Sequence, residues 1–303
     1  MSTTKRSTSL VLLLSLSCYT CGESKTQATD TPKTVAPIAV EKQATPTEMP
    51  SDQRSIVIGK GFSLNSKILG QSRNINVILP MSYEAGSQKY PVLYLIDGGV
   101  QQDLIPVASF GALATLTGQY REFIIVGVET VNRKLELTTP STEVYDLLQI
   151  PQNGGADDFR RFILEEVQPR INSQYRTTEE TAVLGESLAG LFIVDTFLRM
   201  PESFTHYIAV SPSLWWKDKE LAKSSAAYLS DESFPKHRSL YLASADEIDI
   251  GEAIKPLHQA LIHKAPKSLT WWYQPMPAEH HNTIYHPATL NALRLIFAPS
   301  EEK

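Results

Sequence analysis

Ser187 stands in the local setting that a catalytic nucleophile needs. An apolar strand pattern runs into a Gly-x-Ser turn at this residue and continues directly into a helical pattern. A serine on such a sharp strand-to-helix turn exposes its hydroxyl, and small residues on either side let the strand and the helix pass closely. Gly185 stands two positions before the serine and Ala189 stands two positions after it. Because an ordinary N-capping serine would give the same pattern, the prediction of a nucleophile depends on its partners.

A nucleophilic serine needs a base, and histidine titrates in the pH range that suits this task. Proteins that carry a serine on this kind of turn place the histidine late in the chain, after the last strand. The last strand pattern covers residues 269–273, and His280, His281 and His286 follow it. This position favours His281, with His280 as the second candidate and His286 as the third.

An acid should orient the histidine, and it is expected after the preceding strand pattern, at residues 240–243. Asp246, Glu247 and Asp249 all stand just beyond that pattern. Solvated loop carboxylates would give the same pattern. We rank Glu247 first, Asp246 second and Asp249 third, and the choice among them stays open on these grounds.

Attack by a serine on a carbonyl also requires backbone N–H groups that bind the developing oxyanion. Leu188 follows the serine at the start of the predicted helix, where N–H groups point at negative charge. A second donor is expected from the loop after an earlier strand, and the apolar run at residues 91–96 ends in Asp-Gly-Gly. We predict this donor at Gly98 or Gly99, because glycine lets the backbone approach a bound carbonyl closely. A plain turn is the alternative.

The elements that must position these residues alternate along the chain from residue 92 onward. The predicted strands cover residues 55–58, 75–79, 92–96, 123–128, 182–184, 207–210, 240–243 and 269–273. The predicted helices cover residues 157–175, 188–200, 217–229, 254–264 and 288–297. Such alternation predicts an α/β protein with an open, mostly parallel central sheet and helices on both faces. With the serine turn, it predicts one α/β-hydrolase domain over residues 55–303, its site at the C-terminal ends of the strands.

Residues 1–21 have the three-part pattern of a secretory signal peptide. A basic start at Lys5 and Arg6 precedes a short apolar run at residues 10–16, and small residues flank Cys18. The apolar run is too short to span a membrane. A cysteine after such a run also resembles a bacterial lipoprotein signal, in which Cys18 would carry lipid. We expect a secreted or periplasmic protein, and attachment to a bacterial membrane through this lipid stays open.

Composition limits the remaining possibilities. Residues 22–54 are rich in Thr, Pro, Ala, Lys and Glu and have no aromatic residue, which predicts a disordered linker. The formal net charge of −5 gives no basic footprint for nucleic acid. The two cysteines of the chain, Cys18 and Cys21, both precede the predicted domain. That domain can therefore hold no disulfide, no thiolate metal site and no cysteine nucleophile.

In combination, these motifs resemble the esterase D and enterochelin-esterase-like branch of the α/β-hydrolases. The resemblance spans roughly residues 55–299 and rests on segments 90–98, 127–140, 154–176, 185–192, 211–216 and 279–284, in that order. In that family the catalytic histidine usually precedes a residue, then Ser or Thr, then an aliphatic residue, which favours His281. A glutamate often stands at the position of Glu247. The sequence departs from the family at Ser244, where glycine is common.

The resemblance implies a serine carboxylesterase that acts through an acyl-enzyme on a small-molecule ester, such as a siderophore, carbohydrate or aryl ester. It implies no metal and no organic cofactor. Trp215 and Trp216 could form an acyl or aryl pocket or pack in the core, and Arg133 could meet an acidic or catecholate substrate. Two alternatives are an acyltransferase of the same fold and an inactive binding protein that keeps the fold.

Overall fold

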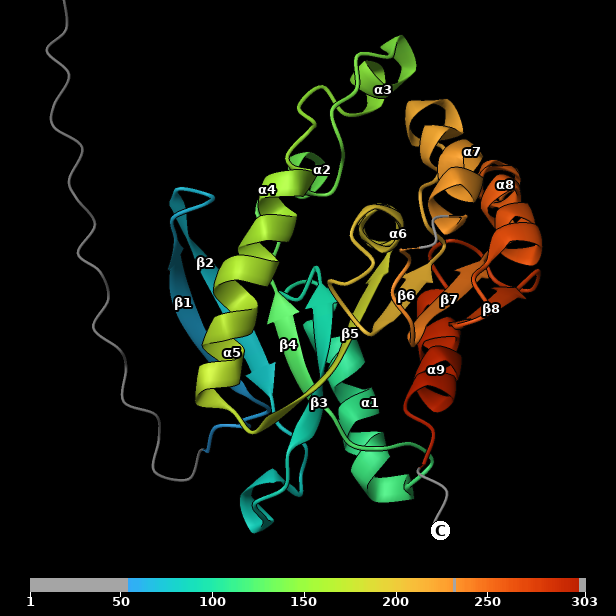
Figure 1. The fold of residues 1–303 in the computed structure, drawn as a ribbon. Helices are drawn as coiled ribbons and strands as arrows, with labels where there is room; N and C mark the ends of the chain where they lie inside the picture. The colour runs from blue at the N-terminus through green and yellow to red at the C-terminus, as the bar shows by residue number, and fades with distance from the viewer. Residues whose placement is uncertain (1–53, 231–232, 300–303) are drawn as a thin grey trace, which may run out of the picture. The chain divides into compact units, whose positions relative to one another are not determined.

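The computed structural model describes residues 54–230 and 233–299. The predicted signal peptide, Cys18 and nearly all of the predicted linker lie outside these residues. The division of the chain by contacts places a boundary after Ser55, and the unit that follows begins at Ile56. The unit from Ile56 onward carries the sheet and the helices described below (Figure 1). Within the described ranges, each helix is too short or too polar to cross a bilayer.

Eight strands form one sheet in the order β1-β2-β4-β3-β5-β6-β7-β8. They are β1 (Lys60–Ser66), β2 (Gln71–Ile78), β3 (Tyr90–Ile96), β4 (Ile124–Val128), β5 (Thr177–Glu186), β6 (His206–Val210), β7 (Arg238–Ser244) and β8 (Leu269–Pro275). The first two strands pair antiparallel, β2 also pairs antiparallel with β4, and all the other pairs are parallel. The predicted mostly parallel α/β sheet is therefore confirmed.

Helices cover both faces of this sheet (Figure 1). They are α1 (Leu104–Thr117), α2 (Arg133–Glu136), α3 (Val144–Gln149), α4 (Ala156–Arg161), α5 (Gln168–Gln174), α6 (Leu188–Arg199), α7 (Trp216–Leu229), α8 (Ile248–Lys264) and α9 (Tyr285–Ile296). Helices α1 and α9 pack against one face, and α4 to α8 pack against the other. Residues of β3 alternate between these two cores, with Leu93 and Leu95 in one and Tyr94 in the other. Because both faces are buried, the parallel strands are continuous apolar runs.

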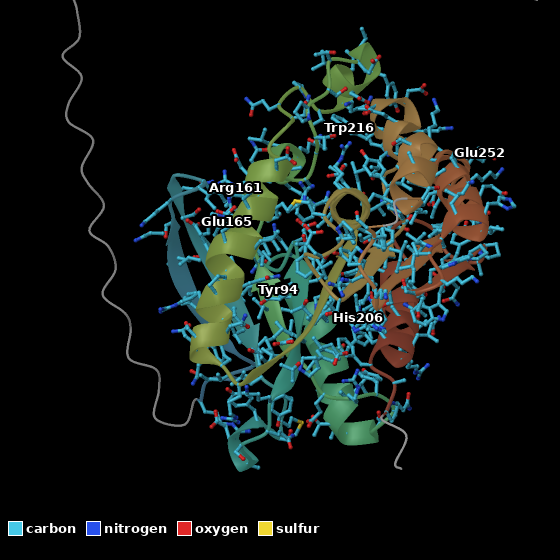
Figure 2. All side chains as sticks on the ribbon, in the orientation of Figure 1. Tyr94, Arg161, Glu165, His206, Trp216 and Glu252 are labelled. Atoms are coloured by element: carbon cyan, nitrogen blue, oxygen red, sulfur yellow. The ribbon has the colours of Figure 1, made fainter. Side chains whose placement is uncertain are left out.

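Two expectations about the elements were wrong. Residues 55–58 were predicted as a strand, but they are irregular, and Ile56 is 91% exposed. The edge strand is instead β1, whose partly buried Phe62 and Leu64 pack against the core. The predicted helix at 157–175 is three consecutive segments, because a π-helical stretch (Phe162–Val167) joins α4 to α5. Arg161 and Glu165 lie on the outer surface of this helical run (Figure 2). Tyr94 of β3 is fully buried in the core between the sheet and these helices.

Candidate active site

Ser187 lies on the turn between β5 and α6, as predicted. Its φ of 62° and ψ of −119° are strained for a residue with a side chain. Hydrogen bonds on both sides hold this conformation: Ser187 N–H donates to Val210 O at 3.0 Å, and Ser187 O accepts from Ser213 N–H at 3.0 Å. Strain that the surrounding structure maintains in this way is typical of functional sites.

The small residues around the serine serve the close passage of β5 and α6. A Cβ added to Gly185 would lie 2.5 Å from the Cβ of Ala189, a separation that real Cβ atoms do not reach. Any side chain at Gly185 would therefore push the helix away and displace Ser187. Alanine at position 189 is as large as this contact allows, which explains why the second glycine of the common motif can be absent here.

The C-terminal ends of β5, β7 and β8 bring the predicted residues to one pocket. Its volume is about 360 Å³, which suits a small-molecule ligand. The lining residues are Arg133, Lys134, Gln149, Ile150, Ser187, Leu188, Ser213, Trp215, Glu247, Asp249, Ile250 and His281. The candidate nucleophile, base and acid thus face the same space although they lie far apart in the sequence.

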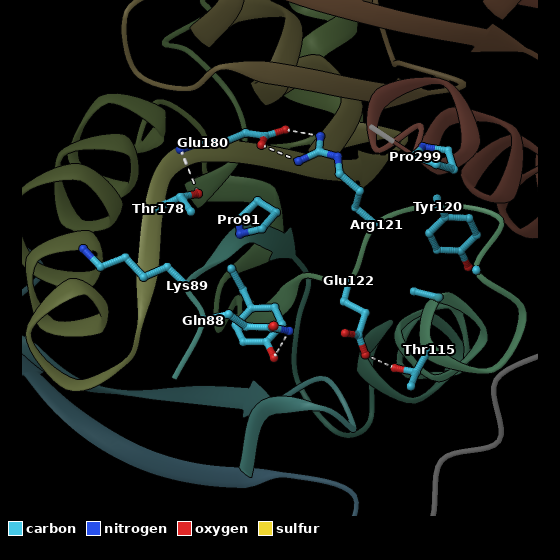
Figure 3. Close-up of a pocket in the computed structure, with 13 residues that line it drawn as sticks. Gln88, Lys89, Pro91, Thr115, Tyr120, Arg121, Glu122, Thr178, Glu180 and Pro299 are labelled. Atoms are coloured by element: carbon cyan, nitrogen blue, oxygen red, sulfur yellow. Dashed lines mark hydrogen bonds and ion pairs between the residues drawn. The ribbon is translucent and has the colours of Figure 1, made fainter. Parts of the chain in front are cut away.

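A larger hollow lies at the opposite edge of the sheet (Figure 3). It measures about 540 Å³, and Lys89, Glu122 and Thr178 line it near the N-terminal ends of β3, β4 and β5. A two-pronged ion pair between Arg121 and Glu180 crosses it, at 2.7 and 2.8 Å. None of the predicted catalytic residues lines this hollow. The predicted residues therefore lie at the C-terminal ends of the strands, where sites are expected in such sheets, and not at the larger hollow.

His281 follows β8 and is partly buried, whereas His280 and His286 are exposed. Its Nδ1 lies 2.8 Å from the hydroxyl oxygen of Ser211, a residue that the sequence analysis did not single out. Burial lowers the pKa of His281, and Arg133 lowers it further, while Glu247 and Asp249 raise it. The net pKa lies below the ordinary value for histidine. The imidazole is thus neutral near pH 7 and can accept a proton.

Glu247 contacts His281 through the backbone. Its Oε1 accepts a hydrogen bond from the His281 N–H, and its Oε2 is buried without a partner among the described residues. Burial raises the pKa of Glu247, but hydrogen bonds from two backbone N–H groups and the nearby histidines outweigh burial and lower it. The group is therefore a carboxylate. Asp246 is exposed, and Asp249 lines the pocket. Direct orientation of the imidazole by Glu247 stays a prediction.

The two candidate glycines of the oxyanion hole differ. The N–H of Gly98 donates to Val128 O at 2.9 Å, and a Cβ at this residue would lie 2.2 Å from Gly127 Cα. Gly98 thus serves the contact between β3 and β4, and its N–H is not free for an oxyanion. The N–H of Gly99 donates to the side chain of Gln102 at 3.0 Å, a partner that can rotate away. Leu188 is the first residue of α6, so its N–H has no partner within the helix.

The two tryptophans separate. Trp215 lines the pocket and makes an edge contact with Tyr145, at 5.9 Å between ring centroids. Trp216, at the start of α7 (Figure 2), is only 3% exposed, and its Nε1–H donates to Thr139 O at 3.1 Å. The prediction that Trp216 forms part of the substrate pocket is therefore corrected: this residue packs in the core.

Arg133 lines the pocket and also lies near a group of acids next to the serine turn, namely Asp97, Asp103 and Glu186. Its Nε donates to Asp97 Oδ2 at 2.7 Å, and its Nη2 donates to Glu186 O at 3.2 Å. Burial and neighbouring acids raise the pKa of Glu186 to about 8 and that of Asp103 to about 6. The sequence analysis missed this group, although Glu186 stands directly before the nucleophile. Within the described part of the chain, no cluster of His, Cys, Asp and Glu is arranged to hold a metal ion.

Comparisons with known proteins show which proteins this chain is similar to. A family model described as "Putative esterase" matches residues 66–251. Ferri-bacillibactin esterase BesA of Bacillus subtilis is 26% identical over 232 residues, which cover 69% of this chain and 80% of that protein. Apo-salmochelin esterase of Escherichia coli is 23% identical over 225 residues, which cover 69% of this chain and 70% of that protein.

Solved structures give the same result for the fold. An IroE-like serine hydrolase from Shewanella oneidensis superposes with a TM-score of 0.72 at 25% identity and covers 79% of this chain and 80% of its own. BES protein from Bacillus cereus superposes with a TM-score of 0.71 at 20% identity and covers 82% of this chain and 99% of its own. The predicted α/β-hydrolase fold is therefore confirmed.

Proposed function

The chain belongs to this esterase family and is a serine ester hydrolase, and on that premise we propose that its substrates are siderophore esters and that Ser187 and His281 carry out the reaction. One observation carries the assignment of the residues. The strained turn directs Ser187 into a pocket that His281 and Glu247 also line. The alternative of an inactive binding protein is not supported, because relatives along most of the chain are esterases.

In the proposed mechanism, Ser187 Oγ attacks the ester carbonyl carbon while His281 Nε2 takes the hydroxyl proton. The N–H groups of Leu188 and Gly99 bind the oxyanion. The intermediate then collapses, and the imidazolium returns the proton to the departing alcohol. Water attacks the acyl-enzyme in the same way, with His281 again as base, and releases the carboxylic acid. In each half of the reaction, His281 takes one proton from the nucleophile and returns one proton to the leaving oxygen.

The described hydrogen bonds do not include one between Ser187 and His281. Instead, Ser187 Oγ lies 3.3 Å from the hydroxyl oxygen of Ser213. Catalytic hydrogen bonds are often long or misaligned in a free enzyme and tighten once substrate is bound. We therefore expect the contact between Ser187 and His281 to form when an ester occupies the pocket and the serine hydroxyl leaves Ser213.

The siderophore assignment is supported by the relatives and by the pocket. Proteins similar to this chain are named as esterases of ferri-bacillibactin, of salmochelin and of enterobactin. Arg133 and Lys134 give the pocket two cations, and Trp215 gives it an aromatic wall. Cations and aromatic rings suit a ligand that carries anionic catecholate groups.

A panel of purified esters tests this proposal. We expect the wild-type chain to hydrolyse a catecholate trilactone with a kcat/KM at least tenfold above that of short acyl, aryl and feruloyl esters. Ser187→Ala should reduce kcat by about four orders of magnitude and should abolish labelling by a fluorophosphonate probe. Preference for another ester would overturn the siderophore assignment alone. More than a tenth of wild-type activity in Ser187→Ala would overturn the assignment of the nucleophile.

We also propose export from the cytoplasm. The basic, apolar and small-residue pattern of residues 1–21 supports a signal peptide, and Cys18 supports lipid attachment. Expression of the full chain in a bacterium with radiolabelled palmitate should label wild-type protein and leave Cys18→Ser unlabelled. Export without label would support cleavage of a plain signal peptide instead.

A further inference from the structure

Ser211 makes the side-chain contact to the imidazole that an acid usually makes. The residue follows β6 directly and is fully buried, with a φ of 43°. Its backbone N–H donates to Ala243 O at 2.8 Å, which fixes the residue against β7. Its hydroxyl oxygen lies 2.8 Å from His281 Nδ1. A rigid strand end therefore holds this hydroxyl against the ring.

The chemistry sets the direction of this hydrogen bond. His281 can take the proton of Ser187 only through a ring nitrogen that faces the pocket and carries no hydrogen. Since Nδ1 faces Ser211, that nitrogen is Nε2, and Nδ1 must carry the hydrogen in the neutral ring. Nδ1–H then donates to Ser211 Oγ. The hydroxyl thus selects the tautomer in which Nε2 is free to act as base.

The carboxylate of Glu247 is occupied elsewhere. Its Oε1 accepts from the backbone N–H of His281 and not from the ring. The charged groups that act on the ring are Glu247 and Asp249, from the start of α8, and Arg133, from α2. The two carboxylates favour the imidazolium through space, while neither supplies the hydrogen bond at Nδ1.

We propose that Ser211 is a positioning residue that holds His281 in its reactive tautomer, while Glu247 anchors the histidine backbone and stabilises the imidazolium by charge. This inference rests on the proposed pair of Ser187 and His281. In a typical serine hydrolase triad, one carboxylate both orients the histidine ring and stabilises the imidazolium. Here a neutral hydroxyl orients the ring, and a separate acid supplies the charge.

The test compares two variants of Ser211 with a matched control. Ser211→Ala and Ser211→Gly both remove the hydroxyl, and glycine accepts the positive φ without strain. The control is Ser239→Ala: Ser239 is also buried, and its Oγ lies 2.7 Å from Nδ1 of His206, at the far end of β6. This control removes the same kind of hydrogen bond away from the pocket.

Both Ser211 variants should lower kcat on the best ester by about 10- to 100-fold and leave KM within about threefold. Ser239→Ala should keep kcat within about twofold. An imidazolium N–H is a stronger donor than a neutral one, so loss of the hydroxyl destabilises the charged ring more. The acid limb of the kcat/KM profile should therefore move to lower pH, by about half a unit. A general loss of structure would not move this limb.

The inference is overturned if both Ser211 variants keep kcat within about twofold of wild type while His281→Ala is inactive. It is also overturned if Glu247→Gln is as damaging as Ser187→Ala and the Ser211 variants are nearly normal, because the ring would then depend on the acid. Activity in His281→Ala would instead refute the proposed pair itself. If Ser211→Ala folds poorly, Ser211→Gly decides the question.

Discussion

The imidazole of His281 lies between groups that change its pKa in opposite directions. Burial and Arg133 lower the pKa, whereas Glu247 and Asp249 raise it. Arg133 therefore favours the neutral ring, whereas Glu247 and Asp249 favour the protonated ring. This balance makes the pH dependence of the enzyme sensitive to single charges around the pocket.

Removal of these charges should move the acid limb of kcat/KM in opposite directions. Glu247→Gln removes a group that raises the pKa of His281, so the limb should move to lower pH. Arg133→Gln removes a group that lowers this pKa, so its limb should move to higher pH. The wild-type limb should lie below pH of about 6.5. Stopped-flow assays on a chromogenic ester between pH 4 and 9 measure all three, and shifts of equal sign would contradict the prediction.

The adjacent histidines should differ strongly in importance. His281→Ala should cost nearly as much activity as Ser187→Ala, because members of such a site act as a unit. His280 is exposed and does not line the pocket, and its backbone N–H donates to the Thr283 hydroxyl at 2.9 Å. His280→Ala should therefore keep activity within about tenfold of wild type. An inactive His280→Ala beside an active His281→Ala would show that the assignment is wrong by one residue.

Glu186 should make the stability of the domain fall as the pH rises from about 4.5 to about 8. Burial raises its pKa to about 8 in the folded state, so the folded chain keeps a proton that the unfolded chain loses near pH 4.5. Stability therefore declines between about pH 4.5 and pH 8, because the folded state binds more protons there. Glu186→Gln cannot ionise, so its advantage in Tm over wild type should grow by about 3 °C or more between pH 5 and pH 9.

The control for this measurement is Glu165→Gln, on the exposed surface of the π-helical stretch. Its Tm should stay close to that of wild type at both pH values, because exposed ion pairs contribute little. An advantage for Glu186→Gln that is the same at pH 5 and pH 9 would show that burial of the charge is not the cause.

Residue types and order were enough to place Ser187 on the turn between β5 and α6 and His281 in the loop after β8, because the turn and the last loop carry local constraints on sequence. Ser211 could not be found in this way. Its contact with His281 joins residues 70 positions apart and depends on how the loops after β6 and β8 meet, although β7 lies between these two strands. For the same reason, sequence could place Glu247 near the histidine but could not show that its carboxylate binds the backbone.

The short helix α3 beside the pocket has one buried side chain, that of Asp146. Its residues Val144, Tyr145 and Leu148 are largely exposed, while Asp146 is buried. Asp146 Oδ2 accepts from Lys217 N–H at 3.0 Å and from the Ser141 hydroxyl. The backbone of residues 217–219 is left-handed in all three positions, which places that N–H toward the carboxylate. Asp146 thus ties α3 to the start of α7.

Asp146→Ala should loosen α3 and weaken the pocket wall. Tyr145 contacts Trp215, and Gln149 lines the pocket, so displaced α3 should raise KM more than it lowers kcat. The loss of a buried carboxylate with two donors should also lower stability by about 1–3 kcal/mol. Steady-state kinetics and thermal unfolding measure both effects. Asp146→Asn keeps an acceptor oxygen and should be milder, so equal effects from the two variants would contradict this role.

Helices and strands with a clear apolar periodicity were predicted from the sequence. Helix α1 and strand β1 were not predicted, and residues 55–58 were wrongly predicted as a strand, for physical reasons. The helix α1 lacks the contrast between an apolar and a polar face, because apolar and small residues fill nearly all of it. The edge strand β1 has polar residues at the positions that face outward, so its sequence resembles a loop. The apolar run at residues 55–58 has no neighbour to pack against, and composition alone cannot show that.

At the scale of the molecule, the proposed site depends on the whole sheet because each of its residues follows a different strand. Ser187 follows β5, Ser211 follows β6, Glu247 follows β7 and His281 follows β8. Parallel pairing brings these four ends to one edge. Any change that shifts one strand against its neighbour should therefore reduce activity before it unfolds the protein.

The N-terminal boundary of the working enzyme should lie between residue 54 and β1. Residues 54–60 are exposed, whereas β1 pairs with β2 from Lys60 to Ser66. A chain of residues 54–303 should therefore keep kcat/KM within about twofold of the full chain and Tm within about 2 °C. A chain that begins at Lys67 lacks β1, exposes the edge of β2 and loses the packing of Phe62 and Leu64. It should melt several degrees lower and aggregate, because an unpaired edge strand recruits other chains. Thermal unfolding, light scattering and ester turnover on both chains give the answer, and a destabilised 54–303 chain would show that earlier residues contribute to the fold.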